Sequence, residues 1–485
     1  MVARLTRFCY RGKINDFVEF YACKFNDFEV KYRYKINDFG VFMTFRRKIY
    51  DKFIDWKRES NGKSALLVEG ARRVGKSTIV EEFAKNEYKS YILIDFTKAP
   101  QEVFKLFDDV SDLNYIFMRL QIIYKKDLYE RKSLVIFDEV QFCPKARQAI
   151  KHLVADHRYD YMETGSLISI RKNVKDILIP SEERPIQMYP MDYEEFKWAL
   201  GDTVTIKFLR EAFEKRKPFG DDLNRTLMRD FRLYMLVGGM PKVVSTYLET
   251  NNMRLVDEEK RDILRLYESD FMKIDSTGKA ALLFNSIPSQ LEKNASRYQV
   301  SSVLENQRNS TVLELIAEME SSKTVLVSYK SNDPNAGLAR TKDLENFKLF
   351  VCDTGLFTTM LFLDKDFTEN VIYERLLSDK LSVNLGYLYE NVVAQILKAN
   401  GNSLFYYAFL DEKSRHNFEI DFLLARKNKV CPIEVKSSGY KTHASLDAFC
   451  AKYSSRILDK YLLNTKDLGK DKDVLSLPVY MTMFL

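Results

Sequence analysis

The stretch that most constrains this chain is Gly70-Ala-Arg-Arg-Val-Gly-Lys-Ser77, whose spacing is G-x-x-x-x-G-K-S. Glycines at these positions let a loop curl so that several backbone N–H groups point at one anion. The apolar run at residues 65–68 suits a buried strand, and residues 78–85 suit a helix with an apolar stripe. The sequence therefore predicts a loop that holds a nucleoside triphosphate at a helix N-terminus.

Within this loop, side-chain chemistry gives two residues particular roles. Lys76 can reach the β- and γ-phosphates, and the Ser77 hydroxyl can ligate Mg²⁺. ATP and Mg²⁺ are therefore the expected cofactors. The expected nucleotide-binding residues are Gly70, Arg73, Val74, Gly75, Lys76, Ser77 and Thr78.

A second apolar run, Ser133 to Phe137, ends in the carboxylates Asp138 and Glu139. Strands of a parallel sheet deliver such side chains to one edge, where the phosphates also lie. We expect Asp138 to hold Mg²⁺ and Glu139 to polarise the attacking water, so that Glu139 and Lys76 form the catalytic pair.

A third segment, Thr164-Gly165-Ser166, also follows a strand-like run. Thr164 or Ser166 could sense the γ-phosphate from that position. A turn that needs Gly165 explains the same three residues nearly as well, so both interpretations stay open.

The composition fits a multidomain globular protein, because 485 residues with 46% apolar content are enough for about three domains. The net charge of +7 permits an acidic partner such as DNA without requiring one. The six cysteines form no C-x-x-C pair, which argues against a zinc site or a disulfide framework. No apolar stretch approaches the roughly 18 residues of a membrane span, so we expect a cytoplasmic protein without a membrane partner.

The residue composition and the predicted secondary structure change several times along the chain. Residues 1–42 repeat Lys-Ile/Phe-Asn-Asp-Phe at a period of 11, and this extension need not belong to the fold. Residues 43–204 alternate strand-like and helical patterns, which predicts a parallel sheet covered by helices, the α/β class. Residues 205–277 are mostly helical with a break at 238–241, and 278–364 place helices before a hairpin, as in a winged helix or in a plain helical connector. Residues 365–485 are α+β.

Several of these segments together resemble a prokaryotic family of AAA-type ATPases that carry a C-terminal domain of poorly defined function. The resemblance rests on the segments 70–78, 138–144, 164–166, 189–196, 238–241 and 348–356. It implies an AAA-type core, a helical lid at 205–277 and a winged-helix-like element at 278–364, but no substrate. In the wider superfamily an arginine from a neighbour often completes the site, and Arg171 and Arg184 are candidates by position.

The last domain holds a second set of chemically active side chains. Residues 417–425 and 430–436 read as two strands of a hairpin, in which Asp421 lies opposite Glu434 and Lys436 shares their face. Two facing carboxylates repel each other unless a cation lies between them. Mg²⁺ is the natural candidate for a second divalent metal, because it prefers carboxylate and water oxygens.

Upstream, Glu390 lies on an amphipathic helix between the small residues Gly386 and Ala394. Glu390, Asp421, Glu434 and Lys436 together resemble the PD-(D/E)xK nuclease fold, in which acids hold a metal and the lysine assists the attacking water. The resemblance implies a restriction-endonuclease-like domain over 365–485. A surface Glu-Lys pair is the alternative explanation for Glu434 and Lys436.

Three functions follow as hypotheses. The first is ATP binding with Mg²⁺-dependent hydrolysis that drives or switches the C-terminal domain. The second is an ATP-regulated DNA nuclease that uses the four C-terminal residues. The third is a nucleotide-switched module that binds DNA or protein without significant turnover, and a protein partner or homo-oligomer stays open in each case.

Overall fold

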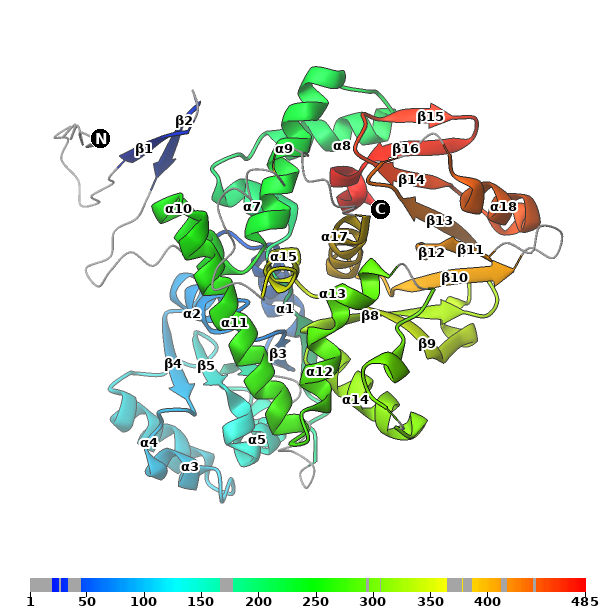
Figure 1. Ribbon diagram of the computed structural model, residues 1–485. Coiled ribbons are helices and arrows are strands. Elements are labelled where there is room, and N and C mark those ends of the chain that lie inside the picture. The colour runs from blue at the N-terminus through cyan, green and yellow to red at the C-terminus, as the bar shows by residue number, and fades with distance from the viewer. Residues whose placement is uncertain are drawn as a thin grey trace.

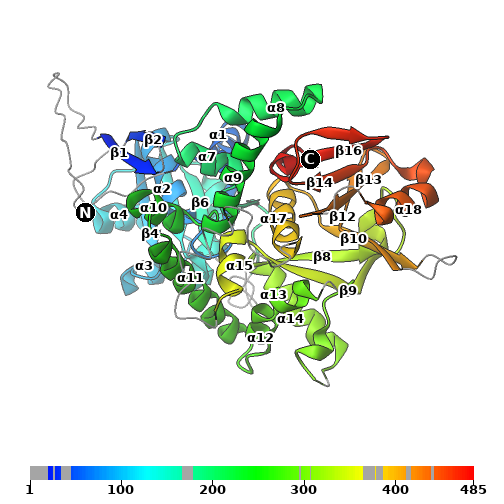
Figure 2. The same ribbon diagram turned by 45° about the horizontal axis from the view of Figure 1, so that its top comes forward.

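The computed structural model describes most of the chain (Figures 1 and 2). Side chains are described at 45–165, 178–293, 296–305, 307–363, 377, 386–410, 417–438 and 442–485. The strands β1 (Phe20–Phe25) and β2 (Phe28–Arg33) pair with each other and with no other strand in the described part of the chain. Ser166, Arg171 and most of the repeats in 1–42 lie outside the described residues.

A parallel five-stranded sheet organises the first half of the chain, in the order β4-β5-β6-β3-β7. Its strands are β3 (Ala65–Glu69), β4 (Ser90–Asp95), β5 (Ser133–Asp138), β6 (Asp160–Gly165) and β7 (Glu183–Gln187). Every residue of β3, β5 and β6 is buried, which explains the nearly unbroken apolar runs of β3 and β5. The predicted α/β core with a parallel sheet is confirmed.

Helices cover both faces of this sheet. The side chains of α1 (Lys48–Ser60) and α2 (Lys76–Glu87) pack on the face that carries Leu66 and Val68. The opposite face is covered by α3 (Gln101–Leu106), α4 (Leu113–Tyr124) and α5 (Pro144–Asp156). Because side chains alternate along β3, its residues contribute to two separate apolar cores, one on each face of the sheet.

After α7 (Tyr193–Ala199), four helices lead away from the sheet. They are α8 (Thr205–Lys215), α9 (Asp221–Val237), α10 (Pro241–Thr250) and α11 (Met253–Ile274). Gly238, Gly239 and Met240 separate α9 from α10, where the sequence indicated a break. In Figure 1 the long helix α11 runs beside the half of the molecule that contains the parallel sheet, toward α12.

The next segment has three helices and then an antiparallel hairpin. The helices are α12 (Lys279–Asn285), α13 (Ile287–Glu292) and α14 (Asn309–Ser321), and the hairpin is β8 (Val325–Ser331) with β9 (Lys342–Val351). Strand β8 also pairs in parallel with β10 (Phe405–Leu410). The hairpin therefore belongs to a sheet of order β11-β10-β8-β9, which spans the predicted boundary near residue 365.

The C-terminal part begins with a helix and four strands, and a second helix and three more strands follow. Its elements are α17 (Gly386–Ala399), β10, β11 (Asn417–Ile420), β12 (Phe422–Arg426), β13 (Lys429–Val435), α18 (Ala444–Lys452), β14 (Tyr461–Asn464), β15 (Gly469–Asp471) and β16 (Val474–Pro478). A second sheet has the order β12-β13-β14-β16-β15. Ala425 lies opposite Val430, as predicted, but the single strand predicted over 417–425 is divided at Asp421 into β11 and β12, which belong to different sheets.

One continuous apolar core joins the two halves of the molecule. It extends from Ile49 on α1 through the α9–α11 helices to Met481 near the C-terminus. Between the halves, α15 (Thr354–Met360) is completely buried and packs against α9, α11 and α17 (Figure 2). None of the described helices is both long enough and apolar enough to cross a membrane.

The N-terminus of α15 meets the break between α9 and α10 at very close range. Asp353 accepts hydrogen bonds from the backbone N–H of Gly239 at 2.6 Å and of Leu356 at 3.0 Å. A Cβ atom on Gly239 would lie 2.1 Å from the Met191 carbonyl oxygen, and one on Gly355 would lie 2.5 Å from the Val237 carbonyl oxygen. The glycines are therefore required by backbone packing at this junction.

We expect Gly239→Ala to destabilise the protein by about 1–3 kcal/mol, because the added methyl group must displace the Met191 backbone. Thermal and denaturant unfolding of the full chain measure the change. Gly469→Ala is the matched control, since its Cβ would meet nothing closer than 3.9 Å. Equal stability of the two variants would contradict the tight junction.

Candidate functional site

The loop between β3 and α2 has the backbone shape that its glycines predict. Gly75 has φ +94° and immediately precedes Lys76, the first residue of α2. A Cβ atom on Gly70 would lie 2.2 Å from the Met188 carbonyl oxygen, so no side chain fits there. Val74 is buried, whereas Arg73 and Thr78 are exposed. The free N–H groups of the first turn of α2 are thus available to an anion.

Lys76 lies inside the loop and is only 7% exposed. Its ammonium group donates to the carbonyl oxygens of Gly70 and Ala71, each at 3.0 Å. Burial lowers the pKa of Lys76, and the nearby carboxylates Glu139 and Asp138 oppose that shift. A bound phosphate would offer this ammonium a stronger, charged acceptor than the two carbonyl groups.

The structure brings three predicted residues together at the carboxyl edge of the sheet. The Ser77 hydroxyl donates to Asp138 Oδ1 at 2.7 Å, and the Thr164 hydroxyl donates to the same oxygen. Thr164 reaches this position because β6 lies between β3 and β5. A hydroxyl beside a carboxylate is a donor set that suits Mg²⁺, so the residues present fit this metal ion.

Glu139 follows Asp138 with a left-handed backbone, φ +54°. Its backbone N–H donates to the Thr164 hydroxyl at 3.4 Å, and its carboxylate accepts a hydrogen bond from the Gln141 side-chain amide. The left-handed conformation turns the chain away from the strand direction at this point. Asp138 and Glu139 therefore have different partners although they are adjacent.

Two contacts to the loop were not identified from the sequence. Arg47, just before α1, donates to the carbonyl oxygens of Val74 at 3.1 Å and Tyr189 at 2.7 Å. From α11, the Tyr267 hydroxyl donates to the Arg72 carbonyl oxygen at 3.0 Å. Neither contact has a local sequence signal, because the partners are separated by 27 to 195 positions.

Of the two arginine-finger candidates, only Arg184 is described. It is exposed on the edge strand β7 and lies opposite Leu66 on β3. The phosphate loop begins after Glu69, which is three residues further along β3 and lies opposite Gln187. Three strand residues span about 10 Å, so this side chain starts well away from the loop of its own chain. Arg171, like Ser166, is outside the described residues.

The four C-terminal residues predicted to act together line one cleft of about 740 Å³. Glu390 comes from α17, Asp421 from the bend between β11 and β12, and Glu434 and Lys436 from β13 and the residues that follow it. Glu419 and Lys330 also line the cleft. The structure therefore gathers the predicted set and adds residues to it.

Protein groups already bind several of the carboxylate oxygens in this cleft. Glu434 is 2.8 Å from the Lys436 ammonium and accepts from the Leu446 N–H at 3.2 Å. Asp421 accepts from the Val435 N–H at 2.7 Å. In the described part of the chain, no group of three or more His, Cys, Asp or Glu is arranged to hold a metal ion. These residues do not fit the predicted second metal.

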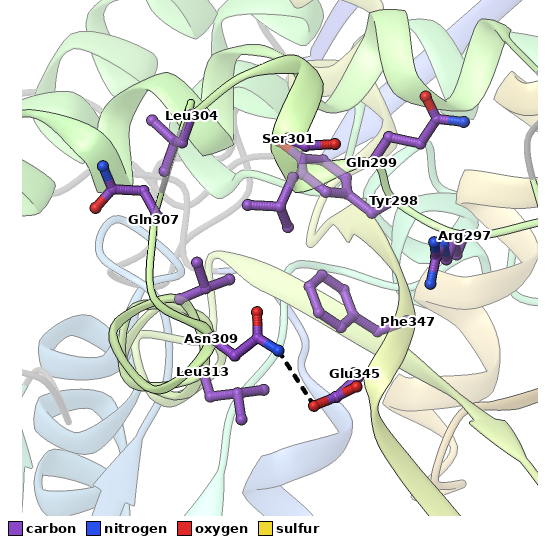
Figure 3. A pocket seen from close by; sticks show the side chains of 12 residues that line it. Arg297, Tyr298, Gln299, Ser301, Leu304, Gln307, Asn309, Leu313, Glu345 and Phe347 are labelled. Carbon is purple, nitrogen blue, oxygen red and sulfur yellow. Dashed lines mark hydrogen bonds between the residues drawn. The ribbon is translucent and has the colours of Figure 1, made fainter.

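A different hollow, of about 470 Å³, lies between α14, β9 and the loop around residue 300 (Figure 3). The Asn309 amide donates to Glu345 at 3.3 Å across it, and Tyr298 stacks on Phe347. None of the residues predicted from the sequence lines this hollow. The sequence gives no independent reason to assign it a ligand.

Helix α14, which precedes the hairpin, has the place that a DNA-reading helix takes in a winged helix. It exposes Glu314 and Glu318, and its 13 residues include no lysine or arginine. Binding to DNA depends mainly on cationic contacts to phosphates. This helix is therefore poorly suited to approach DNA.

Three families match successive parts of the chain. Residues 62–197 match the family described as an AAA domain. Residues 228–366 and 385–480 match two families described as domains of unknown function, DUF8612 and DUF4143. The AAA match covers the loop, Asp138, Glu139 and Thr164. Together with the site geometry, it supports an AAA-type, nucleotide-binding ATPase.

Similarity to solved structures is low in sequence. A Walker-type ATPase of Pyrococcus abyssi is 14% identical, with a TM-score of 0.38, and the match covers 66% of this chain and 96% of that one. The ORC1 protein of Aeropyrum pernix, solved with DNA, is 12% identical, with a TM-score of 0.25 and coverages of 70% and 93%. A STAND protein with a tetratricopeptide repeat sensor from Pyrococcus horikoshii is 12% identical, with a TM-score of 0.25 and coverages of 73% and 48%. No curated protein matches the sequence.

We expect Lys76→Ala to weaken ATP binding by about 10- to 100-fold, the equivalent of about 1.5–3 kcal/mol from a charged hydrogen bond. ATP turnover should fall with it. Titration of the full chain with a fluorescent ATP analogue measures the affinity. Lys85→Ala, on the exposed side of the same helix, is the control and should bind ATP normally. Unchanged turnover in Lys76→Ala would refute the assignment.

The cleft should also make stability depend on pH. Burial raises the pKa of Glu390 from 4.5 to about 7, although the nearby Lys348 opposes the shift. The stability that protonated Glu390 provides is therefore complete below about pH 4.5 and is lost as the pH rises through about 7. Lys348 stays charged in this range, because Glu390 and Glu419 raise its pKa in spite of burial.

Denaturant unfolding at several pH values tests this effect. Wild type should lose stability between about pH 5 and pH 8, and Glu390→Gln should show a smaller slope over the same window. Equal slopes would mean that Glu390 has the same pKa in the folded and unfolded states.

Proposed function

We propose that this protein binds ATP with Mg²⁺, hydrolyses it, and uses the nucleotide state to change the C-terminal cleft. In the nucleotide site, Lys76 contacts the β- and γ-phosphates, Ser77 and Asp138 hold Mg²⁺, and Glu139 polarises the attacking water. Mg²⁺ would neutralise the charge that develops on the phosphates. Support comes from the shared Ser77–Asp138 hydrogen bond and from the match of residues 62–197 to an AAA domain.

Thr164 is suited to report on the γ-phosphate. Its hydroxyl group donates a hydrogen bond to Asp138 and accepts one from the backbone N–H of Glu139. Thr164 therefore contacts both residues that carry the carboxylates. Movement of either residue on nucleotide binding must alter the Thr164 contacts, because one hydroxyl serves both.

The coupling proposal rests on one observation, which is that the phosphate loop is hydrogen-bonded to α11. Tyr267 binds the Arg72 carbonyl oxygen, and the Arg72 guanidinium group is 3.1 Å from Asp270 on the same helix. Burial first, and then the neighbouring Cys352 and Asp353, raise the pKa of Tyr267. Tyr267 therefore lies between the loop and the start of α15.

From α15 the contacts continue to α17. Thr354 donates its N–H and its hydroxyl to the side-chain oxygen of Gln395, at 2.8 and 2.7 Å. Asn391 accepts from the Val351 N–H at 2.8 Å. Both amide side chains belong to the helix that carries Glu390 into the cleft. A shift of α11 thus reaches the cleft through two buried sets of hydrogen bonds.

Hydrogen bonds on the buried side of α11 would make such a shift a rigid-body movement of α11 together with α15. Asp257 accepts from Arg261 at 2.7 Å and from the Thr359 hydroxyl at 2.8 Å, and all three residues are buried. Separating these groups would leave buried charges without partners, which is strongly unfavourable. Helices α11 and α15 should therefore move together.

Hydrogen exchange of the Glu139→Gln variant, with and without ATP, tests the coupling. This variant should bind ATP but hydrolyse it about 10²- to 10⁴-fold more slowly, since it lacks the general base. ATP should change the exchange rates of the α17 amides. Adding Tyr267→Phe should reduce that change while ATP still binds.

Tyr298→Phe is the matched control, because it also removes a buried tyrosine hydrogen bond, 2.9 Å long and ending on Leu283. It should leave the response of α17 intact. If ATP binds to Glu139→Gln and α17 exchanges at the same rate with and without it, the coupling proposal fails while the ATPase assignment stands.

A further inference from the structure

A lysine from outside the predicted set lies inside the carboxylate cluster. Lys348, on β9, is 5% exposed at its side chain. Its ammonium group forms an ion pair with Glu419 and lies 3.7 Å from Glu390 Oε2. It is also 5.6 Å from the centre of the Tyr406 ring, within the range of a cation–π contact.

The sheet that joins the hairpin to the C-terminal strands places Lys348 there. Lys348 lies opposite Ser328 on β8, and β8 pairs with β10, which pairs with β11 and so positions Glu419 opposite Ala408. Residues that face each other across neighbouring strands share one side of a sheet. Helix α17 packs over β8 and β9 and brings Glu390 to the lysine.

The charge balance of the cleft explains why a cation is needed. Asp421 and Glu434 flank the Phe422–Ile433 pair at the end of the β12–β13 hairpin, and both line the cleft together with Glu390 and Glu419. Buried carboxylates that lie this close repel each other and are strongly destabilising without a compensating positive charge. Lys436 compensates Glu434, and Lys348 compensates Glu390 and Glu419.

We propose that the Lys348 ammonium is the resident cation of this cleft, taking the place that a divalent metal ion has in a nuclease centre, so that the cleft takes up no metal. The proposal does not depend on the ATP-driven switch. It follows that the cleft, although it carries the Asp, Glu and Lys of the nuclease pattern, does not cut nucleic acid with Mg²⁺ or Mn²⁺.

The test is Mn²⁺ binding by the full chain, freed of metal and nucleotide and followed by electron paramagnetic resonance. Wild type should show no Mn²⁺ site that depends on Asp421. Lys348→Met, which removes the charge and keeps an unbranched side chain, should gain one site that binds at least about tenfold tighter. Adding Asp421→Asn to Lys348→Met should abolish the gained site.

Lys330→Met is the matched control, since Lys330 lines the same cleft and is not an ion-pair partner of these acids in the described part of the chain. It should gain no Mn²⁺ site. Lys348→Met/Glu419→Gln removes one charge of each sign, and it should fold more stably and bind Mn²⁺ more weakly than Lys348→Met.

The wild-type titration keeps the proposal testable even if Lys348→Met does not fold. One Mn²⁺ bound per wild-type chain and lost in Asp421→Asn would overturn it. So would a folded Lys348→Met that binds no more Mn²⁺ than wild type, or DNA cleavage by wild type that Asp421→Asn abolishes.

Discussion

The hydrogen bonds that the Asp353 carboxylate accepts are the interaction on which the packing of the two halves of this molecule depends. This carboxylate is completely buried and accepts hydrogen bonds from the backbone of Gly239, in the break between α9 and α10, and of Leu356, in the first turn of α15. Burial raises its pKa, and the N–H donors and Lys260 act against that rise. A buried carboxylate is tolerable only while such donors stay in place, so Asp353 fixes the position of α15 relative to the helices that follow the parallel sheet.

In the coupling proposal, the segment around Asp353 connects the nucleotide site to the cleft. Tyr267 connects the phosphate loop to Cys352 and Asp353, and Thr354 connects the same segment to Gln395 on α17. Lys348 lies only four residues before Cys352, on the strand that leads into this segment. Lys348 and the residues that neighbour Tyr267 are thus carried by one short stretch of chain.

Local patterns allowed a good part of this structure to be predicted. The phosphate loop, the strand that ends at Asp138 and the β12–β13 hairpin that contains Glu434 are each set by adjacent residues, so their spacing and alternation are visible in the sequence. The approach of Ser77 to Asp138 also followed, because parallel strands share one carboxyl edge.

Contacts between distant segments could not be predicted in this way. In the pair of β8 with β10, Tyr329 lies opposite Phe405, which is far from it along the sequence. The periodicity of the side chains does not indicate which strands form a parallel pair of that kind. Lys348 and Glu419 were missed for this reason, as was Arg47. The segment 238–241 was noted as a break in a helical region and by resemblance, and 348–356 only by resemblance. The structure supplies the physical reason for both, which is the fit of Asp353 and Gly355 against Gly238 and Gly239.

The most direct test of the account is the ATP affinity of Gln395→Ala in the full chain. Gln395 lies on α17 and contacts Thr354 and the Tyr234 hydroxyl, and Tyr234 in turn binds the Met191 carbonyl oxygen. Coupling between two sites is reciprocal, so loosening α17 should change ATP affinity by about fivefold or more. A folded Gln395→Ala protein that binds ATP as wild type does would contradict the account.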